Sequence, residues 1–344
     1  MLWHKHLFTY AIGLAGVGVF LGLHLPLPWL FGPMAFCLIA ALLGADLKTV
    51  KPLGDAMRTI LGIAVGATVT VAFLAGLPSL WATLIIVPLM VGVIGLVGVW
   101  YFKTVAGYDF PTAYYASMPG GLQDMIVFGE EAGGNVRAIS LIHATRVLVI
   151  VVLLPLILTF VWDANLDRPP GAPIHTVGWD QLGIMAVCGL LGWQGAKRIG
   201  LFGASILGPM ILAAIASLAG ILTIRPPAEA IWAAQYFIAI GIGTKYAGIT
   251  GAELRHDVAS GLVFCLILLV LTAIVVEAVV LLDLATPIDA ILSLAPGGQA
   301  ELLVLALIVG ADIGFILAHH LLRILVVILG APLMARLFAT KPMD

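Results

Sequence analysis

One motif that occurs twice constrains this chain more than any other feature. Residues 118–155 and 295–332 align without a gap at an offset of 177, and eleven of the 38 aligned positions are identical. The identical pairs are Pro119/Pro296, Gly120/Gly297, Gly121/Gly298, Val127/Val304, Gly133/Gly310, Ile139/Ile316, His143/His320, Arg146/Arg323, Leu148/Leu325, Val149/Val326 and Pro155/Pro332. Apolar identities arise easily in an apolar chain, but a shared Pro-Gly-Gly, His and Arg do not. The sequence therefore predicts a duplicated unit.

Composition predicts a membrane protein. The chain is 62% hydrophobic and only 10% charged, which is more apolar surface than a soluble protein of 344 residues can bury. The net charge of −2 gives no indication of nucleic-acid binding. The three cysteines, Cys37, Cys188 and Cys265, all lie in apolar stretches, so we interpret them as small buried hydrophobic residues and predict neither a disulfide framework nor a metal site.

Ten apolar segments are candidate membrane spans, and they fall into two sets around a polar, proline-rich linker at 162–179. They are residues 7–23, 29–45, 56–76, 79–102, 136–161, 180–195, 203–221, 228–246, 257–282 and 313–337. We predict a first membrane repeat over 1–161 and a second over 180–344. The first segment is interpreted as a membrane helix, with a signal peptide as the alternative. The Gly18/Gly22 and Gly62/Gly66 pairs have GxxxG spacing, which is typical of close helix packing.

The placement of Lys and Arg predicts how the two repeats are oriented. Each Pro-Gly-Gly segment, 109–132 and 286–311, either crosses the membrane or enters and returns on the same side. If both return, and Lys5 is cytoplasmic, only Arg168 and Arg225 among the loop bases fall outside. If both cross, Lys197, Arg198, Lys245 and Arg255 all fall outside. We therefore predict an all-α polytopic membrane protein. It has two inverted repeats of five transmembrane helices, each repeat with one re-entrant, broken Pro-Gly-Gly segment, and both termini are cytoplasmic.

The Pro-Gly-Gly turns predict broken helices. Proline lacks an amide donor and restricts the preceding residue, while glycine tolerates positive φ. A second half-helix is expected to begin near Gly121 or Gly298, where its free amides could bind an anion, and the carbonyl groups of the first half-helix could bind a cation. The alternative is a kink that serves only packing. The symmetric duplication favours the binding site.

Acidic, His and Arg side chains follow each turn at equal spacing. Asp124 and Glu301 lie in the first turn of the expected half-helices, either to support the helix end or to bind sodium or a proton. Along the next helix, Asn135, Ile139, His143 and Arg146 share one face, and Asp312, Ile316, His320 and Arg323 repeat this spacing. An Arg at membrane depth costs about 2.5–3.5 kcal/mol on insertion scales, so it needs a partner.

Two interpretations of the arginines stay open. Arg146 could pair with Asp124 and Arg323 with Glu301, or both could hold an anionic substrate, since the planar guanidinium suits a carboxylate. The histidines could relay protons. The candidate substrate- and ion-binding residues are Pro119, Gly120, Gly121, Asp124, His143, Arg146, Pro296, Gly297, Gly298, Glu301, His320 and Arg323.

The double motif resembles that of a known family. The run Met118-Pro119-Gly120-Gly121-Leu122-Gln123-Asp124-Met125, followed by His143 and Arg146 and repeated from Pro296 to Arg323, is similar to the AbrB family of bacterial membrane proteins. These carry an "AbrB duplication" and are often labelled as a putative ammonia monooxygenase or its regulator. The resemblance implies a bacterial inner (plasma) membrane location and a link to gene expression. The second copy departs from the first where Leu122-Gln123 becomes Gln299-Ala300.

Three classes of function are weighed, and a secondary transporter is preferred. The expected substrate is a small organic anion coupled to sodium or protons, and the expected surroundings are the lipid bilayer. The alternative is a membrane sensor or regulator of gene expression that uses a transporter-like fold. A membrane metalloenzyme, which the monooxygenase label suggests, is the remote alternative. We expect no enzymatic activity, no cofactor, no bound metal and no nucleic-acid partner, and a homodimer stays open.

Overall fold

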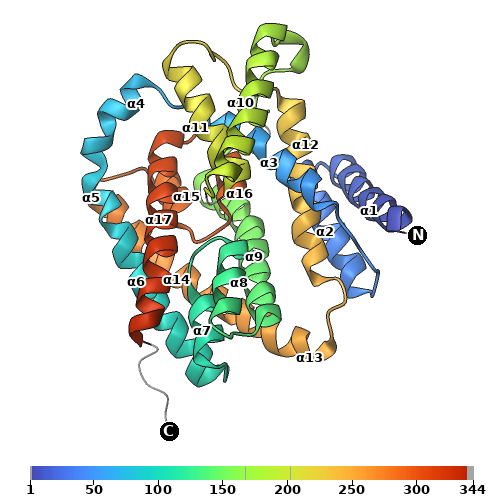
Figure 1. Ribbon diagram of the computed structural model, residues 1–344, viewed down its shortest axis with the longest axis vertical. Coiled ribbons are helices and arrows are strands. Elements are labelled where there is room, and N and C mark those ends of the chain that lie inside the picture. Colours follow the sequence, from blue (N-terminus) through green and yellow to red (C-terminus); the bar gives the residue numbers. More distant parts are fainter. Residues whose placement is uncertain (1, 167, 202, 339–344) are drawn as a thin grey trace. The chain divides into compact units, whose positions relative to one another are not determined.

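Apolar helices make up the computed structural model, which describes residues 2–166, 168–201 and 203–338 (Figure 1). Lys341, one of the bases assigned to the cytoplasm, and Asp167 of the linker lie outside these residues. No strand occurs within the described ranges. The all-α prediction is confirmed.

Five helical segments of the described chain are long and apolar enough to cross a membrane. They are Trp3–Gly22, Phe73–Val105, Val136–Trp162, Gly251–Leu281 and Ile313–Ala335. Three shorter apolar helices are Pro28–Leu42, Ala204–Leu218 and Gln299–Val309. Together with the composition, these helices indicate a multi-pass membrane protein.

The described chain divides into two compact units, and each contains segments from both halves of the sequence. Unit 1 comprises Met1–Leu77, Ile157–Ile249 and Ala300–Gly314, and unit 2 comprises Pro78–Leu156, Thr250–Gln299 and Phe315–Asp344. The main helices of unit 1 are α1 (Leu2–Gly22), α2 (Pro28–Leu42), α3 (Lys51–Gly66), α4 (Val71–Gly76), α10 (Trp179–Arg198), α11 (Ala204–Leu218), α12 (Ala228–Gly243) and α16 (Gln299–Val309). Those of unit 2 are α5 (Trp81–Leu84), α6 (Ile86–Trp100), α7 (Phe110–Ser117), α8 (Leu122–Glu131), α13 (Gly251–Glu253), α14 (Ala259–Leu281) and α15 (Pro287–Leu294), with most of α9 (Val136–Trp162) and α17 (Ile313–Phe338).

Glycine contacts in unit 1 repeat between the two halves. A Cβ built on Gly16 of α1 would lie 2.2 Å from the carbonyl oxygen of Gly32 in α2, and one built on Gly208 of α11 would lie 2.1 Å from that of Gly192 in α10. Only glycine permits backbones to approach this closely. Gly192 and Gly208 follow Gly16 and Gly32 by 176 positions each. Each half therefore builds the same helix pair with the same glycine contact.

A second pair of contacts links the halves within unit 1. A Cβ on Gly66 at the end of α3 would lie 2.3 Å from the carbonyl oxygen of Met210 in α11, and one on Gly243 at the end of α12 would lie 2.7 Å from that of Met34 in α2. Each half thus gives a glycine to the other half's proline-containing helix. Equivalent helices of the two halves therefore exchange equivalent contacts.

One predicted helix is shorter than expected. The segment 56–76 was predicted as a single helix, but α3 ends at Gly66, and α4 begins only at Val71. Thr70 caps the new helix, because its side-chain oxygen accepts a hydrogen bond from the amide of Phe73 at 3.1 Å. A threonine in an apolar run therefore marks the start of a separate helix.

Candidate functional site

Both Pro-Gly-Gly sequences separate two short helices, as the sequence predicts. We call Met118–Gly121, between α7 and α8, the first break, and Ala295–Gly298, between α15 and α16, the second break. Helices α7 and α15 begin and end at positions 177 apart. Met118 and Ala295 have extended backbones with ψ near 130°, because a residue before proline is disfavoured in the helical region.

Neither glycine of the first break has a left-handed backbone, and Gly120 serves close packing. Gly121 has φ −65°, and Gly120 is also outside the positive-φ region. The break therefore forms without using the positive φ that glycine tolerates. A Cβ on Gly120 would instead lie 2.8 Å from Val327 of α17 and 2.8 Å from Met125 of α8. The first break can therefore lie directly against the long helix of the other half.

The two arginines hold the breaks through backbone carbonyl groups. Nη1 and Nη2 of Arg146 donate to the carbonyl oxygens of Met118 at 2.8 Å and Gly120 at 2.9 Å. Nη1 and Nη2 of Arg323 donate to the equivalent oxygens of Ala295 at 2.6 Å and Gly297 at 3.4 Å. Arg146 is 2% exposed and Arg323 is 7% exposed. Each guanidinium thus spans one break with its planar pair of donors.

The two histidines complete the ends of the first half-helices. Nε2 of His143 lies 2.9 Å from the carbonyl oxygen of Tyr115, and Nε2 of His320 lies 2.9 Å from that of Leu292. Tyr115 and Leu292 are in the last turns of α7 and α15, where carbonyl groups have no partner within the helix. Both imidazole rings are fully buried, and the Nδ1 atom of each has no hydrogen-bond partner among the described residues.

The acids occupy the first turns of α8 and α16, as expected, but the proposed ion pair of the first half is absent. Within the described part of unit 2, no ion pair joins Arg146 to Asp124. Nη1 and Nη2 of Arg146 donate to carbonyl oxygens of the break instead, and its Nε is buried without a partner among the described residues, so that interpretation was wrong. Glu301 belongs to unit 1, where it interacts electrostatically with Arg58 of α3. The pairing of Glu301 with Arg323 stays a hypothesis.

Asn135 and Thr112 anchor the long helix of the first half. Asn135 directly precedes α9, and its side-chain oxygen accepts a hydrogen bond from the amide of Ala138 at 3.1 Å. Its own amide donates to the hydroxyl of the buried Thr112 in α7 at 2.7 Å. Asn135, the first residue of the predicted shared face, is therefore a helix cap. The other three residues of that face, Ile139, His143 and Arg146, are all buried.

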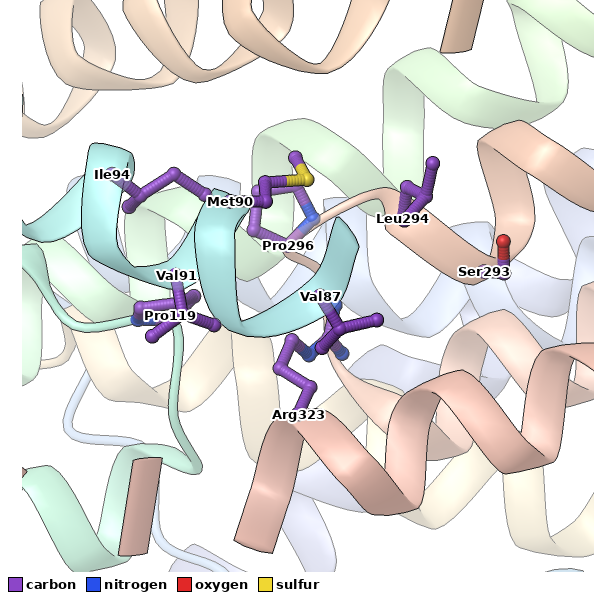
Figure 2. A pocket seen from close by; sticks show the side chains of 9 residues that line it. All are labelled: Val87, Met90, Val91, Ile94, Pro119, Ser293, Leu294, Pro296 and Arg323. Carbon is purple, nitrogen blue, oxygen red and sulfur yellow. The ribbon is translucent and has the colours of Figure 1, made fainter. Parts of the chain in front are cut away.

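A small pocket in unit 2 lies where the two breaks meet (Figure 2). Pro119 of the first break and Pro296 of the second both line it, together with Arg323 of α17. The remaining lining residues are Val87, Met90, Val91 and Ile94 of α6 and Ser293 and Leu294 of α15. The pocket has a volume of about 10 Å³, which is room for about one water molecule. The structure therefore brings the two Pro-Gly-Gly turns together at one place.

Positive charge dominates this place. Arg323 and Arg146 are close enough to interact electrostatically. No group of three or more His, Cys, Asp and Glu side chains among the described residues is gathered in a way that could hold a metal ion. The α6 side chains were not singled out from the sequence, because an apolar residue that lines a pocket looks like one that faces lipid. The backbone partners of the arginines and histidines carried no sequence signal either.

Comparison with known proteins gives a family and two relatives that match over most of their length. The family model described as "Transition state regulatory protein AbrB" matches residues 29–339. "Uncharacterized protein YhjN" of Bacillus subtilis (strain 168) is 26% identical over 97% of this chain and 93% of its own length. "Putative regulator AbrB" of Escherichia coli (strain K12) is 24% identical over 93% of this chain and 92% of its own length. No solved structure matches.

Proposed function

Because the chain belongs to the AbrB family, whose model matches residues 29–339, and carries duplicated helix breaks, we propose that it is a secondary transporter of a small organic anion. The transported species is coupled to sodium or protons. The protein lies in the plasma membrane, its two repeats are inverted, and the Pro-Gly-Gly segments are re-entrant. Its role is transport and not catalysis.

The observation that carries this proposal is the pocket at the two breaks. Transporters of inverted-repeat design bind their substrates where discontinuous helices from both halves meet. Here Pro119 and Pro296, one from each half, line the same pocket as Arg323. Nonhelical backbone at membrane depth is stable only when protein buries it or when it lines a wet cavity.

The charges of the arginines support an anionic substrate. Burying a guanidinium without a counter-charge is costly, and the carbonyl dipoles of the breaks compensate it only in part. Among the described residues of unit 2, neither Arg146 nor Arg323 has a carboxylate within ion-pair distance. A carboxylate or similar anion would supply the missing charge. Because the pocket holds only about 10 Å³, the lining helices must move apart to admit it, as alternating access requires.

The distribution of bases supports the inverted arrangement. The loop after α2 carries Lys48, and Lys51 follows it as the first residue of α3, whereas the equivalent loop after α11 carries only Arg225. The loop after α12 carries Lys245 and Arg255. Positive residues collect in cytoplasmic loops, so equivalent loops of the two halves face opposite sides. This arrangement places both termini in the cytoplasm.

A membrane sensor is the second candidate, because the relative from Escherichia coli is named "Putative regulator AbrB". A sensor would bind the same anion at the breaks and pass the signal to a partner protein. Binding alone therefore does not separate the two functions. Movement of the anion across a membrane does.

The test combines binding with transport. The purified protein is first melted with a panel of small carboxylates and inorganic anions, because a ligand that binds only the folded state raises the melting temperature. An anion that does so is then offered, radiolabelled, to proteoliposomes. Uptake above that of protein-free liposomes supports the transporter. Loss of this uptake in Arg323→Gln, but not in the control variant Arg137→Gln, which also removes one arginine charge, locates the site. Binding without uptake favours the sensor, and no binding by any anion contradicts both.

A further inference from the structure

The carbonyl ends of the broken helices are already occupied. In discontinuous transporter helices, unwound carbonyl groups typically coordinate the coupling sodium ion, while amide ends bind the anion. Here His143 and Arg146 donate to one carbonyl oxygen in the last turn of α7 and two in the first break, and His320 and Arg323 donate to one in the last turn of α15 and two in the second break. These oxygens belong to Tyr115, Met118, Gly120, Leu292, Ala295 and Gly297.

We infer that Arg146 and Arg323 are built-in substitutes for a coupling cation at the two breaks, so that sodium does not bind there. Each guanidinium delivers one fixed positive charge to the oxygens that a metal ion would use. The inference rests on the proposed function for one step, namely that the transported anion moves without sodium. Its structural part concerns the breaks alone.

Geometry and charge exclude a second cation at the same oxygens. The nitrogen–oxygen distances are 2.8 and 2.9 Å for Arg146, and 2.6 and 3.4 Å for Arg323. A sodium ion on any of these oxygens would lie within a few ångströms of a buried guanidinium. Like charges at that separation repel strongly in a medium from which water is largely excluded. Sodium and the arginine are therefore mutually exclusive ligands of each break.

The two breaks are not held equally firmly. The bond from Arg323 to Gly297 is the longest of the four at 3.4 Å, and Arg323 is the arginine that lines the pocket. The second break is therefore the place where a guanidinium can leave one carbonyl and turn toward an anion. Arg146 makes both of its bonds at 2.8 and 2.9 Å and is not among the residues that line the pocket. This difference assigns anion contact to Arg323 and support of the first break to Arg146.

The first experiment needs only the full-length wild-type protein in detergent. Its melting temperature is measured in sodium, potassium and choline chloride at equal ionic strength. We expect the three values to coincide. A melting temperature that rises with sodium relative to choline would overturn the inference, because a folded-state sodium site would then exist. This measurement uses no substrate, so it is independent of whether the protein transports.

Substitution of the arginines gives the converse result. In Arg146→Gln and Arg323→Gln the carbonyl oxygens lose the fixed charge, and we expect sodium to raise the melting temperature with the logarithm of its concentration. Arg137→Gln, which alters an arginine of α9 paired with Glu253 at 2.8 Å, is the matched control and should stay insensitive. Arg146→Lys and Arg323→Lys keep a cation and should also stay insensitive. If neither Gln variant gains a response to sodium, the arginines do not hold the place of a cation.

Transport then separates this inference from the proposed function. With any anion that is taken up, the initial rate in sodium and in choline should agree within about twofold, whereas sodium-coupled transport would lose most of its rate in choline. A strict requirement for sodium would overturn the inference while leaving anion transport intact. Absence of uptake in every salt would contradict the proposed function, and the melting temperatures would still decide the inference.

Discussion

The imidazole Nε2 of His143 lies 2.9 Å from the carbonyl oxygen of Tyr115, and this geometry fixes which nitrogen carries the proton. A carbonyl oxygen only accepts, so Nε2 must donate. His320 makes the same bond to Leu292, also at 2.9 Å. In the neutral ring, Nδ1 is then an acceptor, and it is buried and unpartnered among the described residues in both halves. The same tautomer is thus imposed twice by the ends of α7 and α15.

The first prediction concerns the donor function of these histidines. His143→Leu removes the donor that lies 2.9 Å from the carbonyl oxygen of the buried Tyr115 and puts an apolar group there, which should destabilise the protein by about 1–3 kcal/mol. His143→Gln places an amide N–H at comparable reach and should recover part of the loss. The measurement is the apparent melting temperature of each purified variant. Equal stability of the Leu and Gln variants would contradict a donor role for His143.

The second prediction compares a buried arginine with a surface one. Arg146→Ala removes the groups that donate to the buried carbonyl of Met118 and the partly buried carbonyl of Gly120, and should cost about 2 kcal/mol or more. Arg137 is 40% exposed in its side chain and pairs with Glu253, so Arg137→Ala should cost about 1 kcal/mol or less. Both variants lose one positive charge from α9. Melting temperatures in the same detergent should therefore differ clearly, and similar values would show that the break does not depend on Arg146.

The third prediction tests the glycine crossings of unit 1. A Cβ at Gly32 would lie 2.6 Å from backbone atoms of Gly16, and backbone cannot move aside as a flexible side chain can. Gly32→Ala should therefore destabilise the protein by about 1–3 kcal/mol, the usual cost of overpacking. Gly18→Ala is the matched control on α1, because nothing lies within 4 Å of its Cβ position. Thermal unfolding of both variants checks this, and a neutral Gly32→Ala would contradict the close approach.

The sequence allowed some of these features to be predicted, because side-chain identity alone determines them. Proline and its effect on the preceding residue set both breaks, so α8 begins at Leu122 and α16 at Gln299, next to the predicted glycines. The spacing of His143 and Arg146 also indicated a shared buried face. Of the two GxxxG pairs, Gly62 and Gly66 pack against α11, but nothing within 4 Å of Gly18 explains its spacing.

The partners of the charged residues could not be predicted in the same way. Every residue carries a carbonyl group, so a sequence contains no signal that a guanidinium will bind Met118 or Gly120 through the backbone. A carboxylate such as Asp124 can be identified in the sequence, and for this reason it was considered as the partner of Arg146. The correct partner follows only from the extended backbone of the break, which turns its carbonyl groups toward α9. The apolar lining from α6 was missed for a related reason, since Val87 and Met90 have no chemistry that distinguishes pocket from lipid.

The last prediction tests the inverted arrangement with single cysteines. The native cysteines Cys37, Cys188 and Cys265 are all buried, so a membrane-impermeant maleimide should leave the wild-type protein unmodified in intact cells. His175, in the linker, and Lys197, at the end of α10, are exposed positions on opposite sides of the proposed membrane. The His175→Cys variant should react in intact cells, and Lys197→Cys should react only after the membrane is opened.

The position at Lys197 distinguishes the two arrangements because a single predicted span, residues 180–195 of α10, separates it from the linker. The parallel arrangement, in which the Pro-Gly-Gly segments cross the membrane, places the linker in the cytoplasm and Lys197 outside, and so predicts the reverse pattern. Detergent-treated cells serve as the control that both cysteines are reactive. Labelling of Lys197→Cys in intact cells would rule out inverted repeats and, with them, the placement of the half-helix ends that the proposed transport requires.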